Sequence, residues 1–370
     1  MNILYISNLS NNVDAGLNWS VPASVKAQQM YDNVLWVDLS KDAYQSHWGE
    51  VNTYHNIKEF GGQITLDVLP APFNKPDCVI FEGFYYMEHV KFARELRKYN
   101  IPYIIIPRSA FTKAAFENGG ILKRLKKKVA HFLIFDSFIK KSLAIQYLTE
   151  EERKESKNYN HSSFIVPNGI IMPNIKKEFS TNQIKGVFIG RQDIYQKGLD
   201  FLLDAIAEMH SELTAVGFHL DVYGPPRYDY KLVTKIINEL NISDLVTNHE
   251  KGVRGEEKES VLLGSDVFFL TSRFEGHPMG LIEALSFGVP ALITRGANMY
   301  DEVLETKAGW VSESTKGGVV NSLKKMIEDK NGFDSISRNA VNLAKKYDWN
   351  TLASRFHNNL VIKLNNHKCR

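Results

Sequence analysis

Short runs of apolar and β-branched residues recur along the chain, and longer segments with helical periodicity separate them. The runs of the first half read NILYIS, NVLWVDL, DCVIFEG, YIIIP, HFLIF and SSFIVPN. After about residue 183 the pattern starts again, with GVFIG, FHLDVYG, SDVFFLTS, PALIT and GWVS. Such runs are typical of strands buried on both faces of a sheet. Their alternation with helical segments predicts parallel α/β sheets.

Two such series in one chain predict two doubly wound, Rossmann-like domains. Residues 166–183, with an Asn-Gly pair and two prolines, predict the join between them. We therefore expect an N-terminal domain over residues 1–170 and a C-terminal domain over residues 171–347. The closing segment YDWNTLASRFHNNLVIKL reads as a helix.

Composition narrows the class of protein. The 370 residues are 44% hydrophobic, which is enough for two ordinary folded domains. A net charge of +3 is too small to indicate a nucleic-acid binder. The two cysteines, Cys78 and Cys369, form neither a disulfide framework nor a metal-ligand spacing. The start MNILYIS lacks the features of a signal peptide, and no apolar run is long enough to span a bilayer. We therefore expect a cytoplasmic protein.

The stretch LTSRFEGHPMGLIEALSFGVP places two carboxylates around an uncharged turn. Glu275 falls in the loop after a predicted strand, and Glu283 falls within the following predicted helix. Because ligands of open α/β sheets bind beyond the carboxyl ends of strands, this loop should lie in a cleft between the domains. Gly280 would let a ligand approach the backbone amides of the helix N-terminus, which favours anions.

The stretch GVFIGRQDIYQKG adds two cations to the same kind of strand end. Arg191 follows the predicted strand, and Lys197 precedes the next predicted helix. Two cations and a helix N-terminus predict a diphosphate site. The chain has no Asp-x-Asp sequence, so we expect no metal ion and no other cofactor. Carboxylates accept hydrogen bonds from hydroxyls, which predicts ribose at Glu283 and a sugar at Glu275.

These stretches together resemble the retaining glycosyltransferases of family 4, which have the GT-B fold. The similarity rests on GRQDIYQKG, followed later by EGHPMGLIEALSFGVP with its Glu, seven residues, Glu spacing. It implies two Rossmann-like domains that face an interdomain cleft. It also implies that the closing helix, residues 348–370, packs back on the N-terminal domain.

The resemblance also implies roles for individual residues in transfer with retention of anomeric configuration. Arg191 and Lys197 would bind the donor diphosphate and stabilise the leaving phosphate. Glu283 would bind ribose, and Glu275 would contact the donor sugar. Candidates for the remaining donor contacts are the amides of Gly280 and Leu281 for phosphate and the backbone near Val253 for the base. The family implies UDP as the nucleotide of the donor.

The N-terminal half departs from the family pattern. The loop after the first strand has only Gly16 where the family often has several glycines, and Gly16 is our donor-binding candidate there. The family's Pro-His-Gly corresponds to Pro107, Arg108 and Ser109. Arg108 is either a catalytic residue that faces the donor phosphate or sugar, or part of a structural ion pair.

The run ILKRLKKKVAHF, residues 121–132, is strongly basic from Lys123 to Lys128. Its apolar residues allow two interpretations. It is either an amphipathic helix that docks peripherally on an anionic membrane or a solvated helix face.

The sequence therefore predicts a metal-independent hexosyltransferase that uses a nucleotide sugar. The expected acceptor is a glycan, a lipid-linked glycan or a protein, in the synthesis of a surface polysaccharide or glycoconjugate. Two alternatives stay open: a non-catalytic GT-B partner subunit and a sugar-nucleotide epimerase. Assembly with a partner subunit or as a homo-oligomer also stays open.

Overall fold

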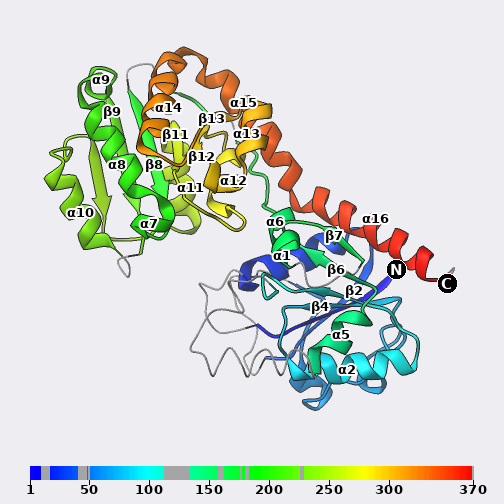
Figure 1. Cartoon of the computed structure of the whole chain (residues 1–370). Coiled ribbons are helices and arrows are strands. Elements are labelled where there is room, and N and C mark those ends of the chain that lie inside the picture. Colours follow the sequence, from blue (N-terminus) through cyan, green and yellow to red (C-terminus); the bar gives the residue numbers. More distant parts are fainter. Residues whose placement is uncertain are drawn as a thin grey trace. The chain divides into compact units, whose positions relative to one another are not determined.

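The computed structural model describes residues 1–9, 17–40, 48, 51–111, 134–156, 162–175, 177–179, 183–225 and 229–368. The chain divides into two compact units (Figure 1). The first unit consists of Met1–Gly169 and Trp349–Arg370, and the second consists of Ile170–Asp348.

The first unit contains a seven-stranded parallel sheet in the order β3-β2-β1-β4-β5-β6-β7. Its strands are β1 (Asn2–Ser7), β2 (Asn33–Asp38), β3 (Tyr54–Asn56), β4 (Cys78–Glu82), β5 (Tyr103–Ile106), β6 (Ala144–Tyr147) and β7 (Ser163–Ile165). Its helices are α1 (Leu17–Gln28), α2 (Met87–Lys98), α5 (Asp136–Lys140), α6 (Glu150–Glu155) and α16 (Trp349–Lys368).

Two apolar clusters cover the two faces of this sheet, because alternate strand residues point to opposite sides. Leu4 and Ile6 of β1 belong to one cluster, and Ile3 and Tyr5 belong to the other. The second cluster also takes in Leu352, Phe356, Leu360 and Leu364 of α16. The C-terminal helix is therefore part of the core of the first unit.

The second unit contains a six-stranded parallel sheet in the order β10-β9-β8-β11-β12-β13. Its strands are β8 (Ile184–Ile189), β9 (Phe218–Tyr223), β10 (Val246–His249), β11 (Val267–Leu270), β12 (Ala291–Thr294) and β13 (Gly309–Ser312). Its helices are α7 (Ile194–Lys197), α8 (Leu199–Glu208), α9 (His210–Ala215), α10 (Tyr230–Glu239), α11 (Gly255–Gly264), α12 (Met279–Ser286), α13 (Tyr300–Thr306), α14 (Lys316–Glu328) and α15 (Phe333–Ala344).

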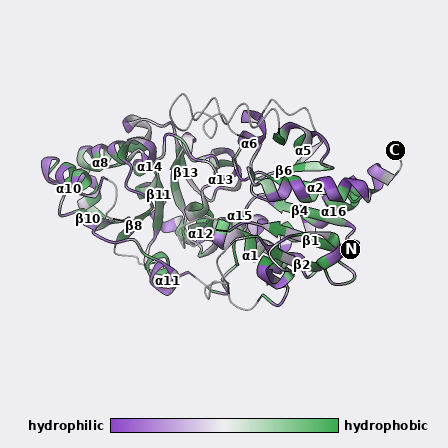
Figure 2. Ribbon diagram, turned by 90° about the horizontal axis from the view of Figure 1, so that it is seen from below, coloured by the Kyte–Doolittle hydropathy of each residue, from purple (hydrophilic) through white to green (hydrophobic). Residues whose placement is uncertain are grey.

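Both sheets have the strand order of a doubly wound Rossmann-like fold, in which the third, second and first strands are followed by the fourth, fifth and sixth. The direction of winding reverses between β1 and β4 in the first unit and between β8 and β11 in the second. The predicted parallel α/β sheets are thus confirmed. In Figure 2 the strands are mostly coloured as hydrophobic, whereas the helices carry both hydrophilic and hydrophobic residues.

Several strands differ from the sequence prediction. The run HFLIF does not form the predicted strand in its described part, because Ile134 and Phe135 lead directly into α5. The strand next to β5 is instead β6, formed by AIQY. The strands β3 and β10 were not predicted, because both are short and half-buried and lack a run of apolar residues. No described helix has the length and apolar character needed to cross a membrane.

Candidate functional site

The switch point of the second sheet brings together the loops that follow β8 and β11. The short helix α7 begins after Asp193, whose side chain accepts a hydrogen bond from the Gln196 amide at 2.8 Å. It ends at Gly198, which has a φ of 60°. A Cβ atom at Gly198 would lie 2.0 Å from the carbonyl oxygen of Thr271. Only glycine lets these two loops pack so closely.

Hydrogen bonds hold the two loops in register. The Thr271 hydroxyl donates to the Gly198 carbonyl at 3.0 Å, and the Arg273 amide donates to the Gln196 carbonyl at 2.9 Å. The Arg273 guanidinium also forms an ion pair with Asp200, at 2.6 Å. The backbone on both sides of Lys197 is therefore fixed against the loop that carries Glu275.

Lys197 and Glu275 form an ion pair at this position. The distance from Lys197 Nζ to Glu275 Oε1 is 2.6 Å, and the exposed fractions of the two side chains are 12% and 9%. The Ser272 hydroxyl donates to the same carboxylate oxygen at 2.5 Å. The Asn298 amide group donates to the Glu275 carbonyl at 2.5 Å. A nearly buried ammonium group thus lies beyond the carboxyl end of β8, and Ser272 and Asn298 hold the glutamate that pairs with it.

Arg191 lies in the loop before α7, whose last residue is Lys197, and it is exposed. Its guanidinium donates to Gln196 Oε1 at 3.2 Å. The two predicted diphosphate ligands are therefore placed on one short segment, six residues apart.

Glu283 forms an ion pair of its own. Its carboxylate contacts the ammonium group of Lys258, and the exposed fractions of the two side chains are 34% and 25%. Lys258 belongs to α11 and Glu283 to α12. This cation was missed by sequence reasoning, and no local pattern connects the two positions.

Gly280 packs at the start of α12. A Cβ atom there would make ordinary van der Waals contacts, at 3.6 Å with Phe268 and at 3.7 Å with the Ile189 carbonyl oxygen. The Leu281 amide donates to the Pro278 carbonyl at 3.0 Å, and the Leu281 side chain is buried. The Cβ position of Gly280 therefore faces the ends of β8 and β11, and the Leu281 amide already has a partner.

The ends of β9 and β10 carry a stacked pair of rings. The centroids of Tyr223 and His249 are 4.1 Å apart, with an angle of 7° between the rings. His249 Nε2 lies 2.6 Å from Asp221 Oδ1. Burial raises the pKa of Tyr223, and the nearby carboxylates of Asp221 and Glu257 raise it further. Val253, the predicted base contact, is buried in the loop between β10 and α11.

Arg108 is held within the first unit. Its Nε lies 2.9 Å from Glu82 Oε2, and its Nη2 lies 3.1 Å from Glu82 Oε1. The exposed fraction is 9% for the arginine side chain and 0% for the glutamate. Arg108 and Ser109 both have a positive φ, of 52° and 64°. Of the two interpretations of Arg108, the structural ion pair is present, and a role toward the donor stays a prediction.

Gly16 and the basic residues Lys123–Lys128 lie outside the described residues. In the part of the chain that is described, no group of three or more His, Cys, Asp or Glu residues could hold a metal ion.

Comparison with known proteins places this geometry in context. Residues 173–343 match the family model described as "Glycosyl transferases group 1". The matched segment lies within the second unit and covers less than half of the chain. It contains Arg191, Lys197, Glu275 and Glu283.

Two curated relatives are similar over part of the chain. The amylovoran biosynthesis glycosyltransferase AmsD of Erwinia amylovora is 30% identical over 151 residues, which are 38% of this chain and 40% of the relative. The MMP alpha-(1->4)-mannosyltransferase of Mycolicibacterium hassiacum is 28% identical over 120 residues, which are 32% of this chain and 27% of the relative. The chain thus spans less than half the length of each relative.

A solved structure matches over the whole chain. HepE from Anabaena in complex with UDP has a TM-score of 0.69 and 15% identity, and the match covers 98% of this chain and 100% of that one. At this identity the likeness shows the fold. The GT-B fold predicted from the sequence is confirmed, and the matches together support a GT-B glycosyltransferase.

Proposed function

We propose that this protein is a retaining glycosyltransferase that moves a sugar from a nucleotide diphosphate sugar to an acceptor hydroxyl. The proposed donor is a UDP-sugar, and no metal ion takes part. The proposed product is part of a surface polysaccharide or glycoconjugate, and the acceptor is a glycan, a lipid-linked glycan or a protein.

The observation that carries this proposal is the ion pair between Lys197 and Glu275 at the switch point of the second sheet. In open α/β sheets, ligands bind in the crevice outside the carboxyl ends of the strands at this point. The pair holds a cation and an acid 2.6 Å apart, with little exposure to solvent. A cation there suits a phosphate, and the acid suits a hydroxyl of the attached sugar. The two curated relatives are named as a glycosyltransferase and a mannosyltransferase, which agrees with this chemistry.

Electrostatic stabilisation is the main contribution that we propose for the protein. The bond between the anomeric carbon and the diphosphate oxygen breaks, and the acceptor oxygen bonds to that carbon on the same face. The acceptor proton moves to the leaving phosphate. Lys197 and Arg191 stabilise the charge that develops on this phosphate, and one such donor is worth about 2.7–4 kcal/mol.

The remaining residues bind the donor. We propose that Glu283, held by Lys258, accepts hydrogen bonds from the ribose. The N-terminus of α12, at Gly280, lies next to the phosphates, because the partial positive charge of a helix N-terminus favours an anion. Backbone near Val253 contacts the base.

Turnover with a panel of nucleotide sugars tests this proposal. The protein is incubated with each donor, with and without acceptor glycans; the products are separated by chromatography, and their configuration is read by NMR. We expect release of the nucleoside diphosphate together with a glycoside of unchanged anomeric configuration. A donor that binds but gives no product with any acceptor supports a non-catalytic subunit. Release of a free, epimerised sugar supports an epimerase.

A further inference from the structure

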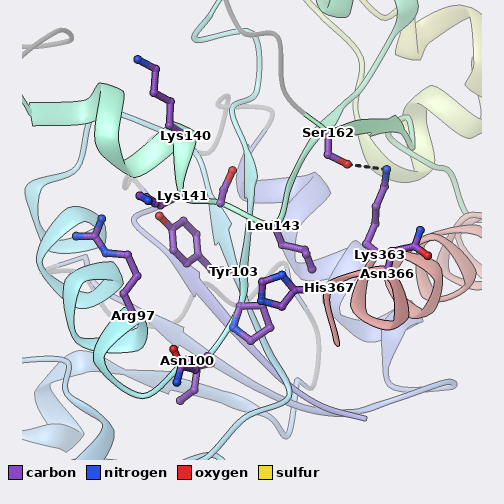
Figure 3. A pocket seen from close by; sticks show the side chains of 13 residues that line it. Arg97, Asn100, Tyr103, Lys140, Lys141, Leu143, Ser162, Lys363, Asn366 and His367 are labelled. Carbon is purple, nitrogen blue, oxygen red and sulfur yellow. Dashed lines mark hydrogen bonds between the residues drawn. The ribbon is translucent and has the colours of Figure 1, made fainter. Parts of the chain in front are cut away.

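A cavity of about 730 Å³ opens in the first unit at the amino ends of β5, β6 and β7 (Figure 3). It lies at the edge of the sheet opposite the carboxyl ends of the strands. Tyr103 begins β5, whereas Leu143 and Ser162 precede β6 and β7. The volume is within the range of about 300–1,000 Å³ that is typical of ligand pockets.

Cationic side chains from three separate helices line this cavity. Arg97 comes from the last turn of α2, Lys140 and Lys141 come from the end of α5, and Lys363 comes from α16. In Figure 3 Arg97 and Lys141 lie on one side, and Lys363 lies on the other. His367 of α16 adds a titratable ring. Among the described residues that line the cavity, none is an aspartate or a glutamate.

The partners of these cations are mostly neutral. Lys140 pairs with Asp136 at 2.8 Å. Lys363 donates to the Ser162 hydroxyl at 2.7 Å, and Arg97 donates to the Ser137 hydroxyl at 3.3 Å. Within the described part of the chain, Arg97, Lys141 and Lys363 have no ion pair with a carboxylate. Their repulsion is unfavourable unless an anion is bound.

A basic residue at the end of a helix can simply complement the helix dipole, as Arg97 does at the end of α2. That explanation does not cover Lys363, which lies inside a longer helix and points to the same cavity. Arg and Lys are the side chains that bind phosphate oxygens. The cavity is larger than one phosphate needs, and its cations lie on two sides.

We propose that this basic cavity is a second anion-binding site, which takes a ligand with at least two phosphate groups, either soluble or carried on a lipid. One phosphate contacts Arg97 and Lys141, and the other contacts Lys363. The site is separate from the candidate donor site, which belongs to the other unit.

Lysine acylation read by mass spectrometry tests this proposal on the full chain. Inorganic pyrophosphate is the soluble probe, and vesicles that contain cardiolipin, a lipid with two phosphate groups, are the membrane probe, with phosphatidylcholine vesicles as their control. We expect either probe to protect Lys141 and Lys363 and to leave exposed Lys324, in α14, reactive. Reading each lysine separately distinguishes this site from the donor site.

A pair of matched variants completes the test. Replacement of Arg97 and Lys363 by glutamine should raise the probe concentration that half-protects Lys141 by about tenfold or more, because two charged contacts are lost. Replacement of Lys91 and Lys98 by glutamine removes the same charge outside the cavity and should change it by less than about twofold. Unfolding midpoints equal to wild type show that each variant is folded.

Protection by pyrophosphate assigns a soluble ligand, and protection by cardiolipin vesicles alone assigns a lipid headgroup. Protection by neither probe overturns the proposal. Equal weakening in the two double variants also overturns it, because net charge rather than the cavity would then explain binding.

Discussion

Replacement of Lys197 by methionine tests the candidate donor site at its centre. The substitution leaves the Glu275 carboxylate, 9% exposed, with the Ser272 hydroxyl as its side-chain partner. Breaking a fully buried ion pair costs about 3–5 kcal/mol, whereas an exposed pair contributes about 0–1 kcal/mol. Because this pair is nearly but not fully buried, we expect a loss of about 2 kcal/mol of unfolding free energy, between these two limits. For a unit of this size that loss lowers the unfolding temperature by about 4–8 °C.

A double variant separates stability from chemistry. With Glu275→Gln added to Lys197→Met, no carboxylate is left unpaired, and we expect most of the lost stability to return. Turnover should stay about 100-fold to 1,000-fold below wild type, because the cation that stabilises the leaving phosphate is still missing.

Thermal unfolding and donor turnover are measured on the wild type, both single variants and the double variant. Lys235→Met is the matched control, since Lys235 pairs with Glu239 on the surface of α10 and is 67% exposed. This control should change unfolding free energy by less than about 0.5 kcal/mol. Wild-type turnover in Lys197→Met, or its recovery in the double variant, would refute the reasoning.

Three further predictions follow from the geometry. Gly280→Ala should unfold like wild type in urea, because its Cβ atom would make only ordinary van der Waals contacts. Gly198→Ala should lose roughly 1–3 kcal/mol of unfolding free energy because of its positive φ and its close contact; equal stability of the two variants contradicts this. Arg108→Leu should lose about 3–5 kcal/mol in urea unfolding, because it leaves the buried carboxylate of Glu82 unpaired; a loss below about 1 kcal/mol means that the pair is not structural. Burial lowers the pKa of His89 to about 3 from 6.5, and neither ring nitrogen has a partner among the described residues. The unfolded chain therefore binds a proton between these pH values that the folded chain does not, so stability falls as pH drops from 6.5 toward 3, by up to about 1.4 kcal/mol per pH unit. In His89→Leu, the unfolding free energy measured with urea should therefore fall less steeply with pH, by that amount. An unchanged decline refutes the assignment.

The strands of both sheets were largely predictable because a parallel strand buried on both faces needs a continuous apolar run. NILYIS and GVFIG meet that requirement, and they form β1 and β8. The strand β10 reads VTNH, and its last three residues are half-buried, so no apolar run indicated it. The run HFLIF was apolar enough for a strand, but Phe135 is buried where the chain enters α5. Burial alone does not distinguish the two structures.

The candidate site was predictable as a set of residues but not as a set of contacts. Local spacing placed Lys197 and Glu275 each at the end of a strand, and the strand order then brought them together. Spacing could not show that they pair with each other, since 78 positions separate them. Lys258 was missed for the same reason, because 25 positions separate it from Glu283. Ser272 lies only three positions before Glu275, but no charge marked it as a partner of that carboxylate.

The central claim is that the ammonium group of Lys197 binds the diphosphate of a nucleotide sugar at the end of β8. A crystal structure of the protein with bound UDP tests it most directly. We expect a phosphate oxygen within hydrogen-bond distance of Lys197 Nζ, with the ribose at Glu283. A nucleotide bound elsewhere, with the Lys197 and Glu275 pair untouched, would contradict the account.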